Sequence, residues 1–259
     1  MIELSKRKLG KLPKKTDPRT FQLKWYLSPE RALPPLPVEQ SWVKHVKSWP
    51  MMLNDALGDC VIATCGHMIQ QWTTYADPEP FVPSDRQILM AYEAVGGYVP
   101  GDPTTDNGCV ILDALNYWRK TGIAGRKIYA FLQLDPKQIS KGDLTQVSQS
   151  VQIFGNCYFG VGLPISAQSQ NAWTVPEGGI YTEEGQPWGW GGHAIPVVAV
   201  SPKTLTCVTW GETLKMSHNF ARDYCDEAYA VLSMDWVEAN GSSPSGFDFA
   251  HLQSDLNQL

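Results

Sequence analysis

One cysteine of this sequence stands where a thiol could act as a nucleophile. Cys60 follows Gly58 and Asp59 and opens an apolar stretch, so we expect it on the first turn of a buried helix with Asp59 as the N-cap. A helix N-terminus lowers the pKa of a thiol and presents free backbone N–H groups beside it. The competing interpretation is packing, since unpaired cysteines are among the most buried residues.

A thiol nucleophile needs a base within hydrogen-bond reach, and the chain has five histidines. His67 lies two helical turns beyond Cys60 and therefore out of reach. His193 follows "PWGWGG" and opens the apolar run "AIPVVAV", which places it at the mouth of a strand. The other three lie in polar surroundings and are predicted to be surface residues: His45, His218 and His251. His193 is thus the candidate base, and a purely structural histidine is the alternative.

The elements that must position these residues change type along the chain. Helical patterns come first, over 60–75, 83–97, 109–123 and 144–154. Strand patterns follow, over 156–164, 193–201, 205–211 and 227–237. This segregation predicts an α+β protein. Residues 1–50 are a Pro-rich, basic N-terminal arm that we expect to be solvated or to face a partner, and residues 241–259 a flexible tail.

Composition bounds the function. The 259 residues suffice for two lobes with a sizeable core, and a net charge of -5 gives no reason to expect nucleic acid as a partner. The sequence lacks an apolar run long enough for a membrane helix and an apolar core near its start for a secretion signal, so a cytoplasmic location is expected. Six cysteines are too few for a disulfide scaffold. The spacing of Cys60, Cys65 and His67 fits a helix better than a zinc site, so we expect no metal and no cofactor.

The order of these features resembles the papain-like cysteine peptidases. "NDALGDC" resembles the family's segment from Gln to Cys, and "TDNGCVILDALNYWRKTGI" its Asn-Gly-Gly loop and cleft helix. "GGHAIPVVAV" resembles its His strand, and "VTWGE" its Asn-Ser-Trp-Gly strand. The resemblance implies a divergent, non-secreted branch with a two-lobe α+β domain over 51–240. It would have an N-terminal helical lobe (about 51–145), a C-terminal antiparallel β lobe (about 146–240) and a cleft between them.

The resemblance also implies a role for each matched residue. Cys60 would be the nucleophile, held as a thiolate by His193, which would then protonate the leaving amine. The Asn54 side chain and the Cys60 backbone N–H would stabilise the oxyanion. The residues that would line the cleft and bind a peptide or protein substrate are Asn107, Gly108, Trp190 and Trp210.

This sequence departs from the family pattern at several positions. The place of the orienting Asn holds Val208, whereas an ungapped count from His193 gives Thr209, whose hydroxyl could accept a hydrogen bond from the imidazole. Asn54 is one methylene shorter than Gln, and the charge of Asp59 opposes thiolate formation. Secreted relatives block the cleft with a long helical pro-segment, and the Pro-rich arm here is predicted to be too short and irregular for that.

Three hypotheses follow. The first is a thiol hydrolase that cleaves peptide or amide bonds through Cys60 and His193. The second is a catalytically inert papain-fold protein with a structural or assembly role, such as a component of a viral or phage particle. It would be held in a homo- or hetero-oligomer by the arm and the tail. The third is also a thiol hydrolase, but one of the bacteriocin-processing or cell-wall amidase branches, because Gly-Asp-Cys before an apolar helix resembles these as well.

Overall fold

The computed structural model describes residues 7–26, 35–237 and 242–245. All but four residues of the predicted tail therefore lie outside the described residues. The helices are α1 (Leu23–Tyr26), α2 (Cys60–Ala76), α3 (Asp85–Gly96), α4 (Ile111–Lys120), α5 (Pro136–Ile139), α6 (Thr145–Phe154) and α7 (His218–Tyr224). The strands are β1 (Gln40–Ser41), β2 (Ile128–Gln133), β3 (Cys157–Leu163), β4 (Gly191–Val200), β5 (Thr204–Thr209), β6 (Glu212–Ser217) and β7 (Cys225–Ser233).

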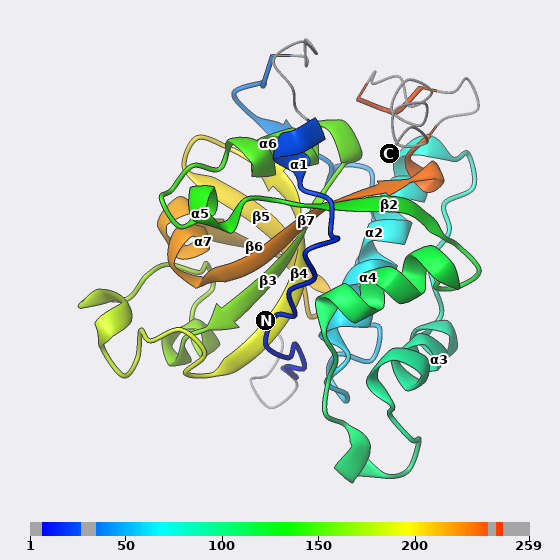
Figure 1. Cartoon of the computed structure of the whole chain (residues 1–259), viewed down its shortest axis with the longest axis horizontal. Coiled ribbons are helices and arrows are strands. Elements are labelled where there is room, and N and C mark those ends of the chain that lie inside the picture. The colour runs from blue at the N-terminus through cyan, green and yellow to red at the C-terminus, as the bar shows by residue number, and fades with distance from the viewer. Residues whose placement is uncertain (1–6, 27–34, 238–241, 246–259) are drawn as a thin grey trace.

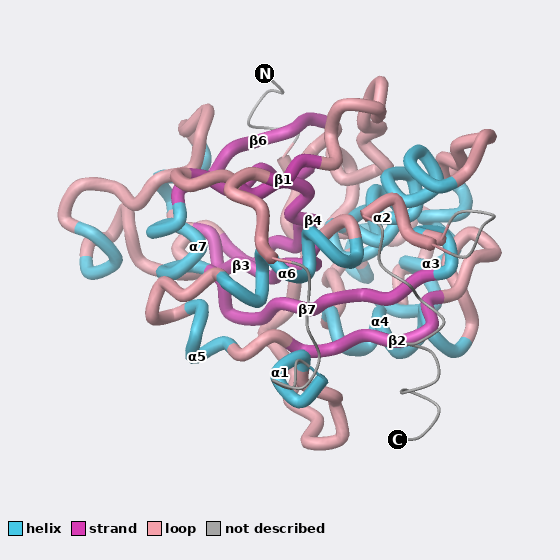
Figure 2. Tube along the Cα trace, turned by 90° about the horizontal axis from the view of Figure 1, so that it is seen from above, coloured by secondary structure: helices cyan, strands magenta, loops and turns pink. Residues whose placement is uncertain are grey.

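The strands form one antiparallel sheet in the order β2-β7-β3-β4-β5-β6, and β1 pairs with β4 outside this path. Helices α2, α3 and α4 gather on one side of this sheet, and α5 and α7 lie at its other end (Figure 1). The view from above shows the same separation (Figure 2). The α+β class with a helical lobe followed by a β lobe is confirmed.

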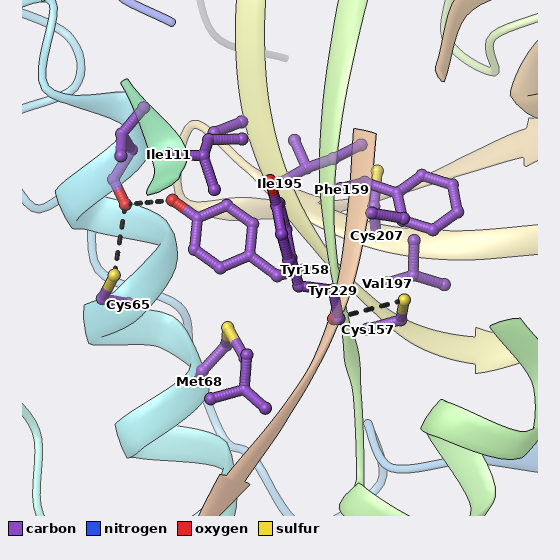
Figure 3. Close-up of a cluster of buried hydrophobic side chains, with 14 of the residues drawn as sticks. Cys65, Met68, Ile111, Cys157, Tyr158, Phe159, Ile195, Val197, Cys207 and Tyr229 are labelled. Atoms are coloured by element: carbon purple, nitrogen blue, oxygen red, sulfur yellow. Dashed lines mark hydrogen bonds between the residues drawn. The ribbon is translucent and has the colours of Figure 1, made fainter. Parts of the chain in front are cut away.

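Helix α2 lies at the contact between the lobes and is buried on every side, although it carries polar side chains such as His67, Gln70 and Gln71. All of its residues from Cys60 to Thr73 are buried. The Tyr158 hydroxyl of β3 donates to the Val61 carbonyl at 2.6 Å, and the Cys65 thiol donates to the same oxygen (Figure 3). The first turn of α2 is therefore fixed to the central strands of the sheet.

The ends of α3 follow the sequence signals. Ser84 and Gln87 form a capping box, in which each side chain accepts from the other residue's backbone N–H. The helix stops at Gly97, which adopts a left-handed conformation with φ of 70°.

The sequence patterns did not predict three of the strands, β1, β2 and β6. Strand β2 lies within the segment assigned to the helical lobe but pairs with β7 in the sheet, so the predicted boundary near residue 145 is wrong for these residues. The predicted strand 205–211 ends at Thr209, because Trp210 and Gly211 have φ of 45° and 73° and turn the chain into β6. A sequence pattern shows apolar alternation but not the sign of φ at a tryptophan.

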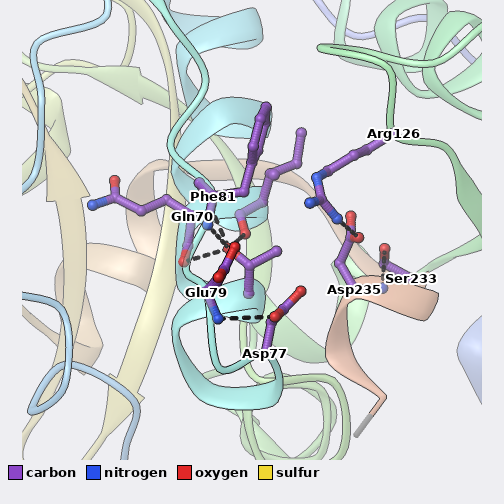
Figure 4. A network of polar contacts seen from close by, with 9 residues as sticks. Gln70, Asp77, Glu79, Phe81, Arg126, Ser233 and Asp235 are labelled. Carbon is purple, nitrogen blue, oxygen red and sulfur yellow. Dashed lines mark hydrogen bonds and ion pairs between the residues drawn. The ribbon is translucent and has the colours of Figure 1, made fainter. Parts of the chain in front are cut away.

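A polar network fastens the lobes at the end of α2 remote from Cys60 (Figure 4). Arg126 forms an ion pair with Asp235, and its guanidinium lies 4.5 Å from the centre of the Phe81 ring. The Asp235 backbone N–H also donates to the Ser233 hydroxyl at 3.1 Å. The two lobes are thus joined by polar contacts at this end.

Within the described residues, no helix has the length and apolar character needed to span a membrane.

Candidate active site

Cys60 is the first residue of α2 and is 1% exposed. Asp59, the residue before it, is not the side-chain N-cap that the sequence predicts. The Asp59 side chain makes no capping hydrogen bond; it is buried, and neither carboxyl oxygen has a hydrogen-bond partner among the described residues. Only the Asp59 backbone carbonyl caps the helix, by accepting from Ile62 and Ala63. Burial raises the pKa of the Asp59 carboxyl well above its usual value.

His193 lies on β4 and is held from two sides. Its Nε2 lies 2.8 Å from the Thr209 hydroxyl, and its ring stacks on Trp210 with centroids 4.4 Å apart. Val208 cannot take the place of Thr209, because successive side chains of β5 point to opposite faces of the sheet. The other ring nitrogen, Nδ1, is buried and has no hydrogen-bond partner among the described residues.

A tight turn places Trp210 over the imidazole. Thr209 and Glu212 pair across the β5–β6 hairpin, so Trp210 and Gly211 form a two-residue loop with both φ positive. A positive φ costs a non-glycine residue about 1–2 kcal/mol, which the packing of the indole must offset. Trp190 adds to this packing, with its ring 5.5 Å from that of Trp210.

The arm segment, which we define as residues 7–12, lies between the two lobes rather than in solvent. On the β side, the backbone N–H groups of Gly10 and Lys11 donate to the Gly192 carbonyl at 3.3 and 3.1 Å. On the helical side, the Cys109 N–H donates to the Gly10 carbonyl at 2.8 Å, and the Leu12 N–H donates to the Cys109 carbonyl at 3.1 Å. In Figure 1 this segment runs in dark blue from the N label along the junction between the sheet and α4.

Two sequence expectations are therefore corrected. The N-terminal arm is not simply solvated, since Lys11 is 3% exposed. The arm is also not too short or irregular to occupy the cleft, because a six-residue extended segment pairs with both lobes through backbone hydrogen bonds. Such pairing needs no helical pro-segment, only an extended backbone with free donors and acceptors.

Asn54 also faces the arm segment. The Lys8 carbonyl accepts from Trp210 Nε1 at 3.0 Å and from Asn54 Nδ2 at 3.4 Å, while the Lys8 N–H donates to the Asn54 carbonyl at 3.2 Å. The Asn54 amide also donates to the Leu57 carbonyl at 3.2 Å. The Asn54 side chain thus directs a donor towards a peptide carbonyl at the lobe junction.

Of the predicted substrate-binding residues, Gly108 comes closest to the arm segment. It has φ of 75°, and a Cβ there would lie 1.9 Å from the Gly10 carbonyl oxygen. Trp210 contacts Lys8, and Trp190 packs against Trp210. Asn107 does not join this group: its side chain is exposed and donates to the Thr104 carbonyl of its own loop.

In this arrangement burial favours the neutral forms of the thiol and of the imidazole. Burial raises the pKa of Cys60 to about 12; the nearby Asp59 carboxyl raises it further, and backbone groups of Ala194 and Gly10 oppose the shift. Burial also lowers the pKa of His193 to about 3. With the arm segment seated, burial therefore opposes the predicted thiolate held by His193. Both shifts come from the exclusion of water, to which the arm segment contributes.

Sequence reasoning missed the residues that support the junction. Cys109 and Gly192 act through backbone groups, which leave no side-chain signal.

Asp106 accepts from the Gly58 N–H at 3.0 Å and from the Tyr92 hydroxyl at 2.6 Å, and that hydroxyl accepts from the Gly108 N–H at 2.9 Å. This network holds the turn before Cys60 against the Gly108 loop. Asp106 lies in the "TDNG" stretch, in which the sequence points to Asn107 and Gly108 but not to Asp106 as site residues.

His67, the histidine on α2, has a structural role. His67 Nε2 lies 2.8 Å from the Pro50 carbonyl oxygen, and burial lowers the pKa of His67 to about 4. Across the described ranges no group of three or more His, Cys, Asp or Glu side chains is placed to hold a metal ion.

Comparisons with known proteins identify the fold. No protein-family model and no curated protein sequence matches the chain. Xylellain, a cysteine protease from Xylella fastidiosa, is 16% identical with a TM-score of 0.64 over 88% of this chain and 97% of its own. The Carica candamarcensis cysteine protease CMS1MS2 in complex with E-64 is 11% identical, with a TM-score of 0.52 over 76% and 99%.

A third solved structure holds the cysteine protease and lectin-like domains of Cwp84, a surface layer associated protein of Clostridium difficile. It is 10% identical, with a TM-score of 0.59 over 88% of this chain and 57% of its own. At these identities the likeness establishes the fold: the chain has the architecture of the papain-like cysteine proteases.

Proposed function

We propose that this chain, which has a papain-like fold, is a thiol hydrolase that cleaves peptide or amide bonds. The observation that carries the proposal is the setting of His193. Its Nε2 contacts Thr209 and Trp210 covers one face of the ring, while Nδ1 has no hydrogen-bond partner in the described part of the chain. The strand that carries His193 packs against α2. A general base needs one nitrogen held and the other available.

The chemistry assigns one step to each group. Cys60 Sγ attacks the carbonyl carbon of the scissile bond, while Nδ1 of His193 takes the thiol proton. The imidazolium then gives this proton to the leaving nitrogen as the C–N bond breaks and a thioester remains. Water, deprotonated by the same imidazole, hydrolyses the thioester and restores the thiol. The Cys60 N–H and the Asn54 amide are the donors for the oxyanion.

The arm segment must leave before a substrate can bind. Its backbone already uses the Cys109 N–H, the Gly192 carbonyl and the Asn54 amide. These are the groups with which a peptide at the same junction would pair. The described structure is therefore the closed state of the proposed enzyme, and removal of the arm segment would rehydrate Cys60 and His193 and return both pKa values towards their usual range.

The test measures the pH dependence of Cys60 alkylation by iodoacetamide, read site by site by mass spectrometry, together with hydrolysis of fluorogenic peptide amides. The protein is the full chain with Gly10→Ala, chosen to unseat the arm segment. We expect Cys60 to react faster than the other five cysteines below pH 7, and His193→Ala to remove both this advantage and turnover.

An unreactive Cys60 in an arm-released, folded protein would contradict the proposal and leave the inert papain-fold protein. Turnover of peptidoglycan stem peptides but not of protein would favour the amidase variant of the hydrolase. Assembly through the arm and the tail, including a place in a viral particle, stays a prediction, as does a cytoplasmic location.

A further inference from the structure

The Lys11 side chain fills a closed, acidic pocket beside the lobe junction. Its ammonium lies 2.9 Å from Asp226 Oδ2 and 3.1 Å from Glu227 Oε1, and it also donates to the Leu12 carbonyl at 3.2 Å. Trp188 covers it, with the ring centroid 4.6 Å from Nζ. The Lys11 and Glu227 side chains are both 0% exposed. We call this site the lysine pocket.

The pocket is shaped for a long, straight side chain. Gly160 lies along its wall, where a Cβ would stand 2.2 Å from Lys11 Cε and 2.9 Å from a methyl carbon of Ile111. The missing side chain at Gly160 leaves room for the aliphatic stem of Lys11. Glu227 is fixed at the end of the pocket by the Tyr229 hydroxyl, which donates to Oε2 at 2.8 Å. Gly160 and Glu227 belong to strands β3 and β7, which are neighbours inside the sheet.

The negative charge of the pocket favours a bound cation. Two carboxyl groups face one ammonium, and Asp226 Oδ1 has no hydrogen-bond partner among the described residues. A buried carboxylate without a cationic partner is costly. Burial raises the pKa of Glu227, and Lys11 opposes that shift more than any other group. Removing the cation therefore leaves a site that strongly favours a new one, and the spare oxygen of Asp226 can also receive a guanidinium.

The pocket lies where an incoming peptide would present a side chain. Gly10 and Leu12, on either side of Lys11, pair with the N–H and carbonyl of Cys109. A peptide backbone that uses the same Cys109 groups must place one side chain in the lysine pocket. The cavity lined by Asp17, Arg19 and Arg119 includes no residue of the arm segment.

We infer that the lysine pocket is the specificity pocket of the proposed hydrolase and selects peptides with a lysine or arginine side chain, a role that rests on the proposed function. In the closed state Lys11 occupies the pocket in place of the substrate's basic residue. The acidic pair Asp226 and Glu227 recognises the charge, while Gly160 and Trp188 fit the stem.

The first experiment measures binding without turnover. The full chain with Cys60→Ala, Gly10→Ala and Lys11→Ala carries an empty pocket and an unseated arm segment. The probe is a fluorescein-labelled peptide with the sequence of residues 7–14, RKLGKLPK, measured by fluorescence anisotropy. Replacing its lysine that corresponds to Lys11 by leucine should weaken binding at least 30-fold, and by glutamate further, whereas arginine should be accepted. Replacing the lysine that corresponds to the exposed Lys8 is the matched control and should change little.

The second experiment changes the pocket. Asp226→Asn with Glu227→Gln should abolish the preference for lysine over leucine, whereas Asp223→Asn, which alters a neighbouring carboxyl outside the pocket, should preserve it. Circular dichroism confirms that each variant is folded. Equal binding of the lysine and leucine peptides, or a preference that survives the double substitution, would overturn the inference.

Turnover separates this inference from the proposed function. If the lysine peptide binds selectively but the arm-released protein with Cys60 intact hydrolyses no lysine or arginine peptide, the proposed function fails and the pocket stands. If that protein hydrolyses leucine and lysine peptides equally well, the hydrolase stands and the pocket assignment fails.

Discussion

Gly10 lies so close to Gly58 that a Cβ on Gly10 would stand 1.6 Å from the Gly58 carbonyl oxygen. Gly58 belongs to the turn that leads into Cys60, and its N–H is held by Asp106. The arm segment is thus seated directly on the turn that presents the thiol. This approach explains the glycine at position 10 and couples the position of the arm to access to Cys60.

The first prediction concerns this contact. Gly10→Ala should expel the arm segment, since a methyl group cannot fit against the carbonyl oxygen of Gly58, a residue whose N–H donates to Asp106. We expect the rate of Cys60 alkylation by iodoacetamide to rise at least tenfold, measured by mass spectrometry. The buried thiols of Cys65 and Cys207 serve as internal references.

A matched control separates arm release from general loss of stability. Gly125→Ala adds the same methyl group where nothing lies within 4 Å, at φ of 78°. It should cost about 1–2 kcal/mol of unfolding free energy but leave Cys60 protected. Equal exposure of Cys60 in both variants would contradict the seating of the arm segment.

The second prediction concerns Thr209. Its hydroxyl contacts His193 Nε2 at 2.8 Å, so Thr209→Ala removes the group that holds the ring. In the arm-released protein we expect turnover of a lysine peptide to fall about 10- to 100-fold, less than the roughly 100- to 10,000-fold that a general acid–base group itself contributes, because Thr209 only positions that group. Thr209→Ser keeps the hydroxyl and should retain most activity. If serine and alanine behave alike, the hydroxyl does not position the imidazole.

The third prediction concerns acid stability. Burial lowers the pKa of His67 to about 4 and that of His193 to about 3, whereas an unfolded imidazole titrates near pH 6.5. Below pH 6.5 the unfolded chain therefore binds protons that the folded chain does not. The unfolding free energy should fall as the pH drops from 6.5 towards 4, by up to about 1.4 kcal/mol per pH unit for each group.

Urea denaturation of two variants at pH 7.5, 6 and 5 checks this. His67→Gln keeps a donor for the Pro50 carbonyl and removes one titrating group, so its stability should depend less on pH than that of the parent. His45→Gln alters an exposed histidine and should follow the parent. Identical slopes for all three proteins would show that His67 binds protons equally in the folded and the unfolded chain.

The fourth prediction concerns Asp59. Burial raises the pKa of its unpartnered carboxyl, so the stability that the group contributes is full below its unfolded pKa of about 3.9 and is lost as the pH rises through the folded pKa. Asp59→Asn removes this loss and should raise the unfolding free energy at pH 8 by about 1–3 kcal/mol, with little change at pH 4.

Urea denaturation at both pH values tests this, with Asp55→Asn, a half-buried aspartate in the same turn, as the control. Because Asp59 also raises the pKa of Cys60, the thiol of Asp59→Asn should react with iodoacetamide at a lower pH in the arm-released protein. An Asp59→Asn protein that is less stable than the parent at pH 8 would point to an interaction of the carboxylate that the structure does not contain.

Elements with local signals can be predicted from the sequence alone. Helix α2 follows from its apolar run, α3 from the capping box of Ser84 and the stop at Gly97, and the central strands β3 and β4 from their short apolar runs. The position of Cys60 at a helix start and of His193 at a strand start follows from those elements. Such features depend on residues a few positions apart, which a pattern can detect.

Contacts between distant segments of the chain can be seen only in the folded structure. Thr209 rather than Val208 lies beside His193, because the pleat of β5 turns only the Thr209 side chain towards His193 on β4. The folded structure also places the arm segment at the lobe junction, where backbone groups of Cys109 and Gly192 pair with it, and puts Lys11 between Asp226 and Glu227, more than two hundred residues away. Backbone hydrogen bonds and long-range ion pairs leave no periodic trace in a sequence, so only the folded chain reveals them.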